Sequence, residues 1–276
     1  MCCFVGQVEV ADTNLFARLT RRGTQFLVYQ MRYQAAQPTA MILPLPAALP
    51  AREENIRWLD LKGYPEFFTH LAAKFPVRQP ISIGCAKADE VAVAKAVLSV
   101  HEVGDFVASF VPTLADFDRL DPRFTLPKSI WAQFPQCHDY GFAVFQLAKL
   151  GGTPHPIAFE FSTRWPDKLF YPTIHIHDGV AHREEHFHHA IYSQGMGAHG
   201  GRSEGRTGEG VQLERTQGIV LDEPLWRIQM LGTYENKDVI LERKSDLPAI
   251  LLGVGGAALI AAGAVGIKKA RGRAVQ

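Results

Sequence analysis

The C-terminal end of the chain carries the feature that most limits how this protein can fold. Residues 247–267 read LPAILLGVGGAALIAAGAVGI, a run of about twenty-one residues without a charged side chain. At a rise of about 1.5 Å per residue, a helix of this length spans roughly 30 Å, the hydrocarbon thickness of a bilayer. The sequence therefore predicts one C-terminal transmembrane helix over residues 247–267, followed by a basic tail over residues 268–276.

The same run indicates where the protein resides and how it could associate. A buried core helix is the alternative, but such a helix usually carries a polar stripe, which is missing here. We therefore expect a single-pass membrane protein with a C-terminal anchor and the lipid bilayer as its partner. Small residues recur at four-residue spacing (Gly253, Ala257, Ala261), which would allow self-association through the transmembrane helix. The side of the membrane stays open: four cations after the helix favour a cytoplasmic tail, whereas the N-terminus carries no signal peptide.

Residues 1–245 have the composition of a folded globular domain. Hydrophobic residues make up 47% and charged residues 21% of the chain, close to the average for such domains. Lys+Arg 29 against Asp+Glu 28 leaves no basic excess, so no nucleic-acid partner is expected. Four cysteines in 276 residues are too few to form a disulfide framework.

Apolar periodicity predicts an α+β fold, mostly antiparallel sheet with a few covering helices. Residues 24–33 (TQFLVYQMRY) are apolar on both faces, as in a central strand, and residues 39–45 form a strand that ends at prolines. Residues 64–75 place three large apolar side chains at helical spacing. Further strands are expected over 81–84, 103–111, 140–150, 157–161, 218–226 and 238–242, and further helices over 89–100 and after Thr113. The Gly-rich residues 195–210 are predicted to form a flexible loop.

Several of these segments carry a resemblance. The order ILPLP (Ile42–Pro46), GDFVASFVPTLADFDRL (Gly104–Leu120), YGFAVFQL, HPIAFEF and YPTIHIHDG resembles an uncharacterised bacterial family of C-terminally membrane-anchored domains. The shared features are an L-P-x-P strand end, an aromatic–Val strand segment and the anchor, and they cover about residues 25–180 plus the tail. Members of that family usually begin with a signal sequence, which this chain lacks. The resemblance implies fold and anchoring, and it brings no activity.

Histidines are concentrated in one place. Seven of the eleven lie between His175 and His199, around the sequence TIHIHDGVAHREEHFHH. Asp178-Gly179 between strand-like runs predicts a hairpin with a type I′ turn. In that register the side chains of five residues share one face of the hairpin. These are His175, His177, His182, Glu184 and His186.

This face predicts a metal site. Imidazole suits Zn²⁺ and Cu²⁺, and three protein ligands leave a coordination position open for water. Glu184 or Asp178 could then act as general base on that water. The alternative is that the histidines only form the solvated face of an amphipathic hairpin.

Cys2 is a second candidate for chemistry. Removal of Met1 would leave an N-terminal cysteine, which can act as a nucleophile with its own α-amine as base. The leading interpretation is nevertheless a non-enzymatic, membrane-tethered domain whose histidine hairpin binds zinc or copper. The alternatives are a metal-dependent or N-terminal-cysteine hydrolase, and a protein-interaction module without a metal.

Overall fold

The two-sided apolar run near residue 24 forms β3 (Thr24–Ala35), a central strand of the larger of two main sheets. The computed structural model describes residues 3–75, 98, 100–147, 149–196, 203–206 and 210–242. β3 pairs with β2 (Val8–Leu19) on one side and with β10 (Ile157–Ser162) on the other. Both faces of β3 are buried over most of its length, because a separate hydrophobic cluster covers each one.

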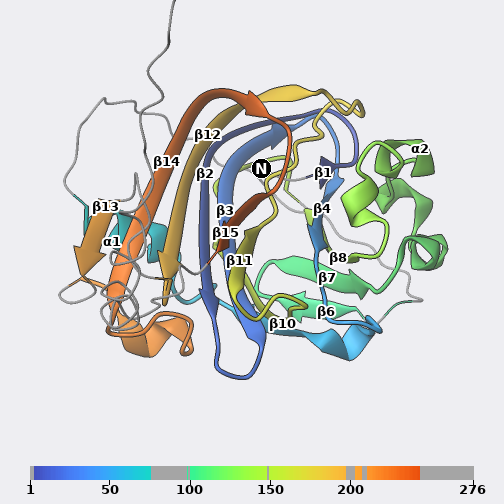
Figure 1. Cartoon of the computed structure of the whole chain (residues 1–276). Coiled ribbons are helices and arrows are strands. Elements are labelled where there is room, and N and C mark those ends of the chain that lie inside the picture. The colour runs from blue at the N-terminus through green and yellow to red at the C-terminus, as the bar shows by residue number, and fades with distance from the viewer. Residues whose placement is uncertain are drawn as a thin grey trace, which may run out of the picture. The chain divides into compact units, whose positions relative to one another are not determined.

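The larger sheet has eight strands in the order β13-β14-β12-β2-β3-β10-β5, and β9 also pairs with β3. Its remaining members are β5 (Ile56–Asp60), β9 (Gly151–Gly152), β12 (Glu184–Gln194), β13 (Ser203–Arg206) and β14 (Pro224–Glu235). Every pairing is antiparallel except the one between β12 and β2, which is parallel. Figure 1 shows β14, β12, β2 and β3 as long curved strands lying side by side.

The second main sheet has five strands in the order β1-β4-β8-β7-β6. These are β1 (Cys3–Phe4), β4 (Thr39–Leu45), β6 (His101–Val103), β7 (Phe106–Val111) and β8 (Gly141–Leu147). A two-stranded sheet of β11 (Lys168–Tyr171) and β15 (Val239–Glu242) adds to the fold. Aromatic rings join the two main sheets: Phe145 of β8 lies 5.3 Å from Trp58 and 6.1 Å from Phe159, measured between ring centroids. The main hydrophobic core therefore lies between these sheets.

Helices are few and short. They are α1 (Phe67–Ala72), α2 (Lys128–Trp131) and the 3-10 turns η1 (Glu53–Asn55), η2 (Leu114–Arg119), η3 (Pro122–Phe124), η4 (Pro135–Cys137) and η5 (Leu213–Thr216). α1 buries Phe67, Phe68 and Leu71 against the outer face of the larger sheet, where Phe67 meets Phe16 edge-on at 6.0 Å. This helix lies within the predicted helical segment 64–75.

The fold is mostly β, and this corrects the α+β prediction. Strands contain 48% of the described residues and helices 14%, and no described helix exceeds six residues. The segment after Thr113 forms only the 3-10 turn η2, and prolines at 122, 127 and 135 interrupt any longer helix there. Residues 8–19, to which the sequence interpretation assigned no element, form the long strand β2.

The prediction of a C-terminal transmembrane helix is also corrected. Among the described residues, no helix is both long enough and apolar enough to cross a membrane. Residues 247–267 and the basic tail 268–276 lie outside the described residues. The single-pass membrane location, the bilayer as partner and self-association through this helix depended on that prediction and are not supported.

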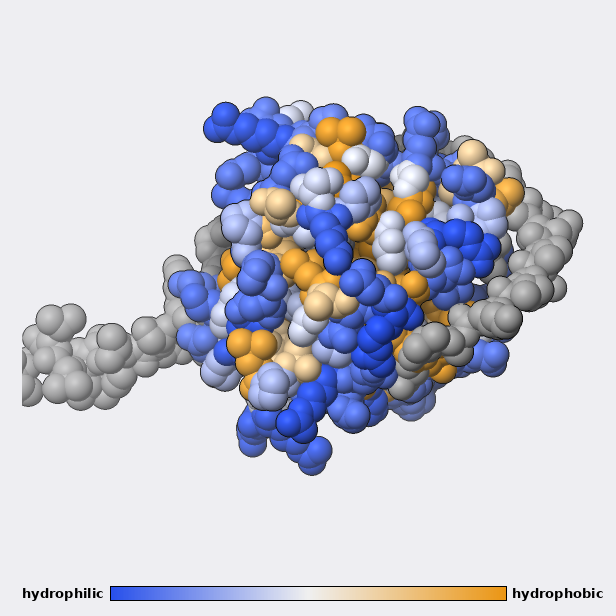
Figure 2. All heavy atoms as spheres, turned by 90° about the vertical axis from the view of Figure 1, so that its right-hand side faces the viewer, coloured by the Kyte–Doolittle hydropathy of each residue, from blue (hydrophilic) through white to orange (hydrophobic). Residues whose placement is uncertain are grey.

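Other predicted segments also fall wholly or largely outside the described ranges. These are the strand over 81–84 and the helix over 89–100. Part of the predicted loop 195–210 is described, and its residues Ser203–Arg206 form β13, paired with the first residues of β14. Figure 2 shows a face on which hydrophobic side chains lie in small groups among hydrophilic ones.

Phe145→Ala tests the packing between the two main sheets. Its side chain is fully buried against Trp58 and Phe159, so the substitution removes aromatic contacts and leaves a cavity. We expect the free energy of unfolding to fall by about 3–5 kcal/mol in urea denaturation. Leu231→Ala, at a residue 57% exposed, is the control and should change the free energy of unfolding by about 0.5 kcal/mol or less. Equal effects of the two substitutions would contradict this packing.

Candidate metal centre

Asp178 and Gly179 form a turn, but the two arms of the predicted hairpin do not pair with each other. Gly179 has φ +80°, and the backbone N–H of Val180 donates to Asp178 Oδ1 at 3.0 Å. Beyond the turn, β12 pairs with β14 on one edge and with β2 on the other, whereas Ile176 forms a bridge to Cys3 of β1. Residues 172–183 reach β12 as an irregular segment.

Side-chain hydrogen bonds from Asn236 hold this irregular segment in place. Asn236 Oδ1 accepts from the backbone N–H of His175 at 2.7 Å, and its Nδ2 donates to the carbonyls of His175 and His182 at 2.9 Å each. On the other side, the backbone N–H of Val8 donates to the carbonyl of His177 at 2.9 Å. These bonds satisfy backbone groups that a hairpin ladder would otherwise have satisfied.

Three histidine rings lie close together in this region. The ring centroid of His175 lies 5.2 Å from that of His177 and 5.2 Å from that of His189, and the rings of His175 and His189 are nearly parallel. Phe187 stacks on His175 at 4.2 Å. His175 and His177 come from the irregular segment, while His189 and Phe187 come from β12. We refer to His175, His177, His189 and the neighbouring Glu185 as the histidine cluster.

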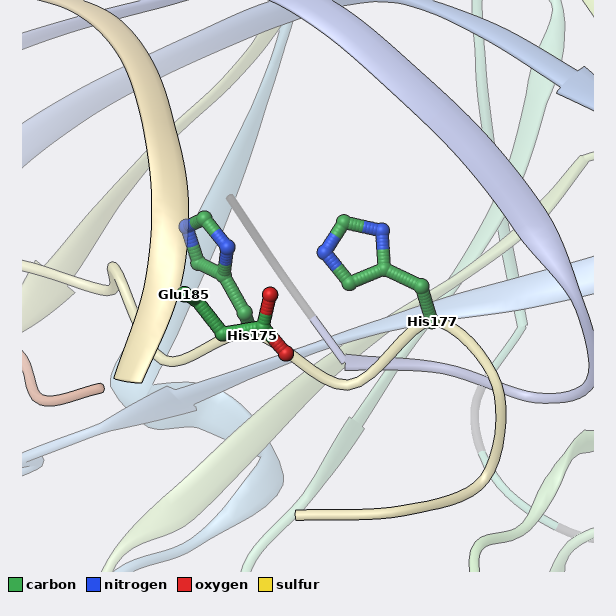
Figure 3. A group of neighbouring side chains, drawn as sticks. All are labelled: His175, His177 and Glu185. Carbon is green, nitrogen blue, oxygen red and sulfur yellow. The ribbon is translucent and has the colours of Figure 1, made fainter. Parts of the chain in front are cut away.

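Glu185 brings a carboxylate to two of these imidazoles. One ligand atom from each of His175, His177 and Glu185 lies within 4.8 Å of the others, and Figure 3 shows these three side chains. Ligand atoms bound about 2.0–2.1 Å from a tetrahedral zinc ion lie roughly 3.3 Å apart. The three groups therefore need to close by at most about 1.5 Å to share one ion.

Burial keeps the imidazoles of the cluster uncharged. His175 is fully buried, and among the described residues neither of its ring nitrogens, nor Nε2 of His177, has a hydrogen-bond partner. Loss of hydration lowers the pKa of His175, His177 and His189, and nearby imidazoles lower it further. Burial also raises the pKa of the Glu185 carboxyl. Neutral imidazole is the form that donates a lone pair to a metal ion.

The structure brings together two of the five predicted ligands, His175 and His177. His182 is exposed and pairs with Asp178 at 2.9 Å, and this hydrogen bond raises the pKa of its imidazole. Glu184 and His186 are exposed on the outer face of β12, because side chains alternate along a strand and Glu185 points to the other face.

Sequence reasoning missed Glu185 and His189, although a signal for them was present. Side chains two residues apart on a strand point to the same face, so Glu185 and His189 share a face with Phe187 and Ile191. Phe187 and Ile191 are apolar and buried, so they mark this face as the buried one. The predicted hairpin register instead placed Phe187 on the face opposite His175. In the structure Phe187 stacks on His175, because β12 takes its register from β14 and β2.

The cysteines take no part in the described cluster. Cys2, the candidate nucleophile, lies outside the described residues. Cys137 is fully buried, and burial raises the pKa of its thiol, so it is held as the thiol. The neighbouring Asp139 pairs with Arg164 at 2.7 Å.

Comparison with protein-family models and with characterised sequences finds no match. Among solved structures, the chain is similar to the crystal structure of baculovirus p35, with 13% identity and a TM-score of 0.44, covering 88% of this chain and 99% of that one. A mutated baculovirus p35 after caspase cleavage has 15% identity and a TM-score of 0.43, covering 86% and 98%. The caspase-8/p35 complex gives 12% identity and a TM-score of 0.40, covering 84% and 96%. Similarities this low establish neither a shared fold nor a shared function.

The metal-free protein should lose stability in mild acid. The three cluster histidines have folded-state pKa values below the unfolded value of about 6.5, so below that pH the unfolded chain binds more protons. The free energy of unfolding should be nearly constant above about pH 7 and fall below about pH 6.5, by up to ~1.4 kcal/mol per pH unit for each histidine. Glu185 and Asp238, whose carboxyl pKa values are raised by burial, oppose this as two groups against three.

Denaturant titration in EDTA across this pH range measures the slope. His189→Phe should make the slope shallower, whereas the exposed control His186→Gln should leave it unchanged. An equal slope in His189→Phe and the unmodified protein would contradict a buried neutral His189.

Asn236→Ala tests the hydrogen bonds that hold the irregular segment. The substitution removes three of them and leaves the buried N–H of His175 without its acceptor. We expect a loss of about 2–4 kcal/mol in the free energy of unfolding. Asn55→Ala removes one exposed side-chain hydrogen bond, to the backbone of Arg52, and should cost about 1 kcal/mol or less. If the two variants lose equal stability, Asn236 does not have the role assigned to it.

Proposed function

We propose that this domain binds one divalent transition-metal ion, zinc or copper, through His175, His177 and Glu185. The observation that carries the proposal is the fully buried imidazole of His175, for which the described residues provide no hydrogen-bond partner at either nitrogen. A buried polar group left unsatisfied costs about 1–3 kcal/mol. Coordination of an ion by one nitrogen would remove part of that cost, since the nitrogen lone pair then has a partner.

The chemistry of the donor groups supports zinc or copper over other ions. Two neutral imidazoles and one carboxylate are ligands that these ions accept. Magnesium and calcium prefer sites made entirely of oxygen ligands, which His175 and His177 cannot provide. Three protein ligands would leave a further position for water or an outside ligand.

The surroundings of the ligands indicate moderate affinity. Zinc-binding histidines usually donate the second ring N–H to a carboxylate or carbonyl group, and loss of such a partner weakens binding about 10–100-fold. Among the described residues, the second nitrogen of His175 has no such acceptor. We therefore expect a dissociation constant one to two orders of magnitude above that of a zinc site with a complete outer shell.

Binding, and not hydrolysis, is the function that these side chains favour. The two carboxylates predicted to act as general base point elsewhere: Glu184 lies on the outer face of β12, and Asp178 pairs with His182. Glu185 itself is one of the three ligand groups. A metal-dependent hydrolase would need a general base from another part of the chain.

Calorimetric titration of the full chain, without a histidine tag, with ZnCl₂ or CuSO₄ tests the proposal. We expect one ion per chain, and His177→Ala and Glu185→Gln should each weaken binding about tenfold or more. The double variant His182→Ala/His186→Ala removes the two exposed histidines of the predicted set and is the matched control, which should bind like the unmodified protein.

The opposite pattern would refute the site. Loss of binding only in the double variant would place the ion on the exposed histidines instead. An absence of stoichiometric binding by the unmodified chain would leave the cluster as a buried polar part of the core, as expected for an interaction module without a metal.

A further inference from the structure

The strand β1 runs alongside the segment that carries two of the three proposed metal ligands. Cys3 forms a parallel bridge to Ile176, and the backbone N–H of Phe4 donates to the carbonyl of Ile176 at 2.8 Å. In the chain, Ile176 lies between His175 and His177. Residues 3 and 4 therefore pass directly beside the histidine cluster.

This pairing decides which side chains of β1 face the histidines. Opposed residues of two paired strands have side chains on the same face of the sheet, and that face alternates along each strand. Phe4 and His177 each follow the bridged pair by one residue, and their ring centroids lie 6.5 Å apart. Phe4 thus marks the face of β1 that looks toward the histidine cluster, and Cys3 points to the other face.

Cys2 is the residue whose position this pairing constrains. It lies outside the described residues, but the chain joins it to Cys3, so the two Cα atoms are about 3.8 Å apart. Cys2 precedes Phe4 by two residues, as His175 precedes His177, and side chains two apart on a strand share a face. A strand that continues through Cys2 in this register would set its thiol beside His175, across the spacing of about 4.8 Å between paired strands.

The charge of the site favours a thiolate as the next ligand. Among the described residues, the group of possible ligands contains two imidazoles, one carboxylate and no thiol. Neutral imidazoles leave the charge of a zinc ion unchanged, and the Glu185 carboxylate neutralises only half of it. A charge left uncompensated beside a fully buried side chain such as His175 is costly. A cysteine thiolate would supply the missing negative charge, and it is a common ligand of structural zinc sites.

We propose that the thiolate of Cys2 is the fourth protein ligand of the zinc ion, beside the two imidazoles and the Glu185 carboxylate. This inference rests on the proposed metal site, and it makes that site a closed, four-coordinate structural centre. The buried imidazole of His175, which has no hydrogen-bond partner at either nitrogen among the described residues, is the group that the ion would join to the thiolate. On binding, the thiol releases its proton to solvent and the Zn–S bond replaces the S–H bond.

Cobalt(II) is the probe, because it takes the place of zinc and reports thiolate ligation in its absorption spectrum. CoCl₂ is titrated into the full chain, without a histidine tag and with its thiols kept reduced. We expect one Co²⁺ per chain, with visible bands of a tetrahedral site and a near-ultraviolet band from thiolate-to-cobalt charge transfer. Cys2→Ala should lose the near-ultraviolet band and should bind zinc at least about tenfold more weakly in competition with a chelator.

Cys3→Ala is the matched control, because Cys3 adjoins Cys2 but points to the other face. This variant should keep the near-ultraviolet band, and circular dichroism checks that both variants fold. A second measurement uses the unmodified protein. Alkylation of Cys2 by iodoacetamide, located by fragment-ion mass spectrometry, should be slowed several-fold by ZnCl₂ relative to EDTA, since the bound thiolate is not free to react. This protection should be lost in His177→Ala.

The outcomes separate this inference from the proposed function. If the unmodified chain binds one Co²⁺ without a near-ultraviolet band, if Cys2→Ala keeps that band, or if zinc does not slow the alkylation, then Cys2 is not a ligand and the inference is overturned, while the three-ligand site stands. If the unmodified chain binds no Co²⁺ and no Zn²⁺, both proposals are overturned.

Discussion

β12 takes its register from two neighbouring strands, and the functional part of the molecule depends on this. Eleven residues of β12 pair with β14, and residues 189–194 also pair in parallel with β2. Residues 172–177 pair with neither edge of β12, so the chain between β11 and β12 crosses without a ladder of its own. Pairing with β14 and β2 decides which side chains of β12 face the interior. Glu185 and His189 point inward, whereas Glu184 and His186 point outward.

An irregular segment in the interior must satisfy its backbone groups by other means. Here side chains of the loop after β14 do so, with Asn236 bonded to His175 and His182, and Asp238 bonded to the two residues before His175. The same three-residue loop therefore holds the segment that carries His175 and His177.

Two polar groups in this part of the chain keep part of their bonding capacity unused among the described residues: the ring nitrogens of His175 and the Oδ2 of Asp238. Burial shifts both groups toward their uncharged forms, lowering the pKa of the imidazole and raising that of the carboxyl. The neutral imidazole is the form that donates a lone pair to a metal ion.

The sequence by itself determined the local elements whose signal lies within a few residues. The two-sided apolar run of β3, the helical spacing around Phe67 and the Asp178-Gly179 turn all depend on side-chain period or local backbone preference, and all three form. His175 and His177 could also be singled out, because two histidines on one face of a short segment are visible in the sequence alone. The fold class was wrong, because short 3-10 turns replace the expected helices and because β2 was not recognised. Tertiary structure decided which strands pair. Local periodicity does not show which strands pair or in which register. A shift of the register by one residue moves every side chain of a strand to the other face of the sheet. That is why Glu185, and not Glu184, faces the two histidines.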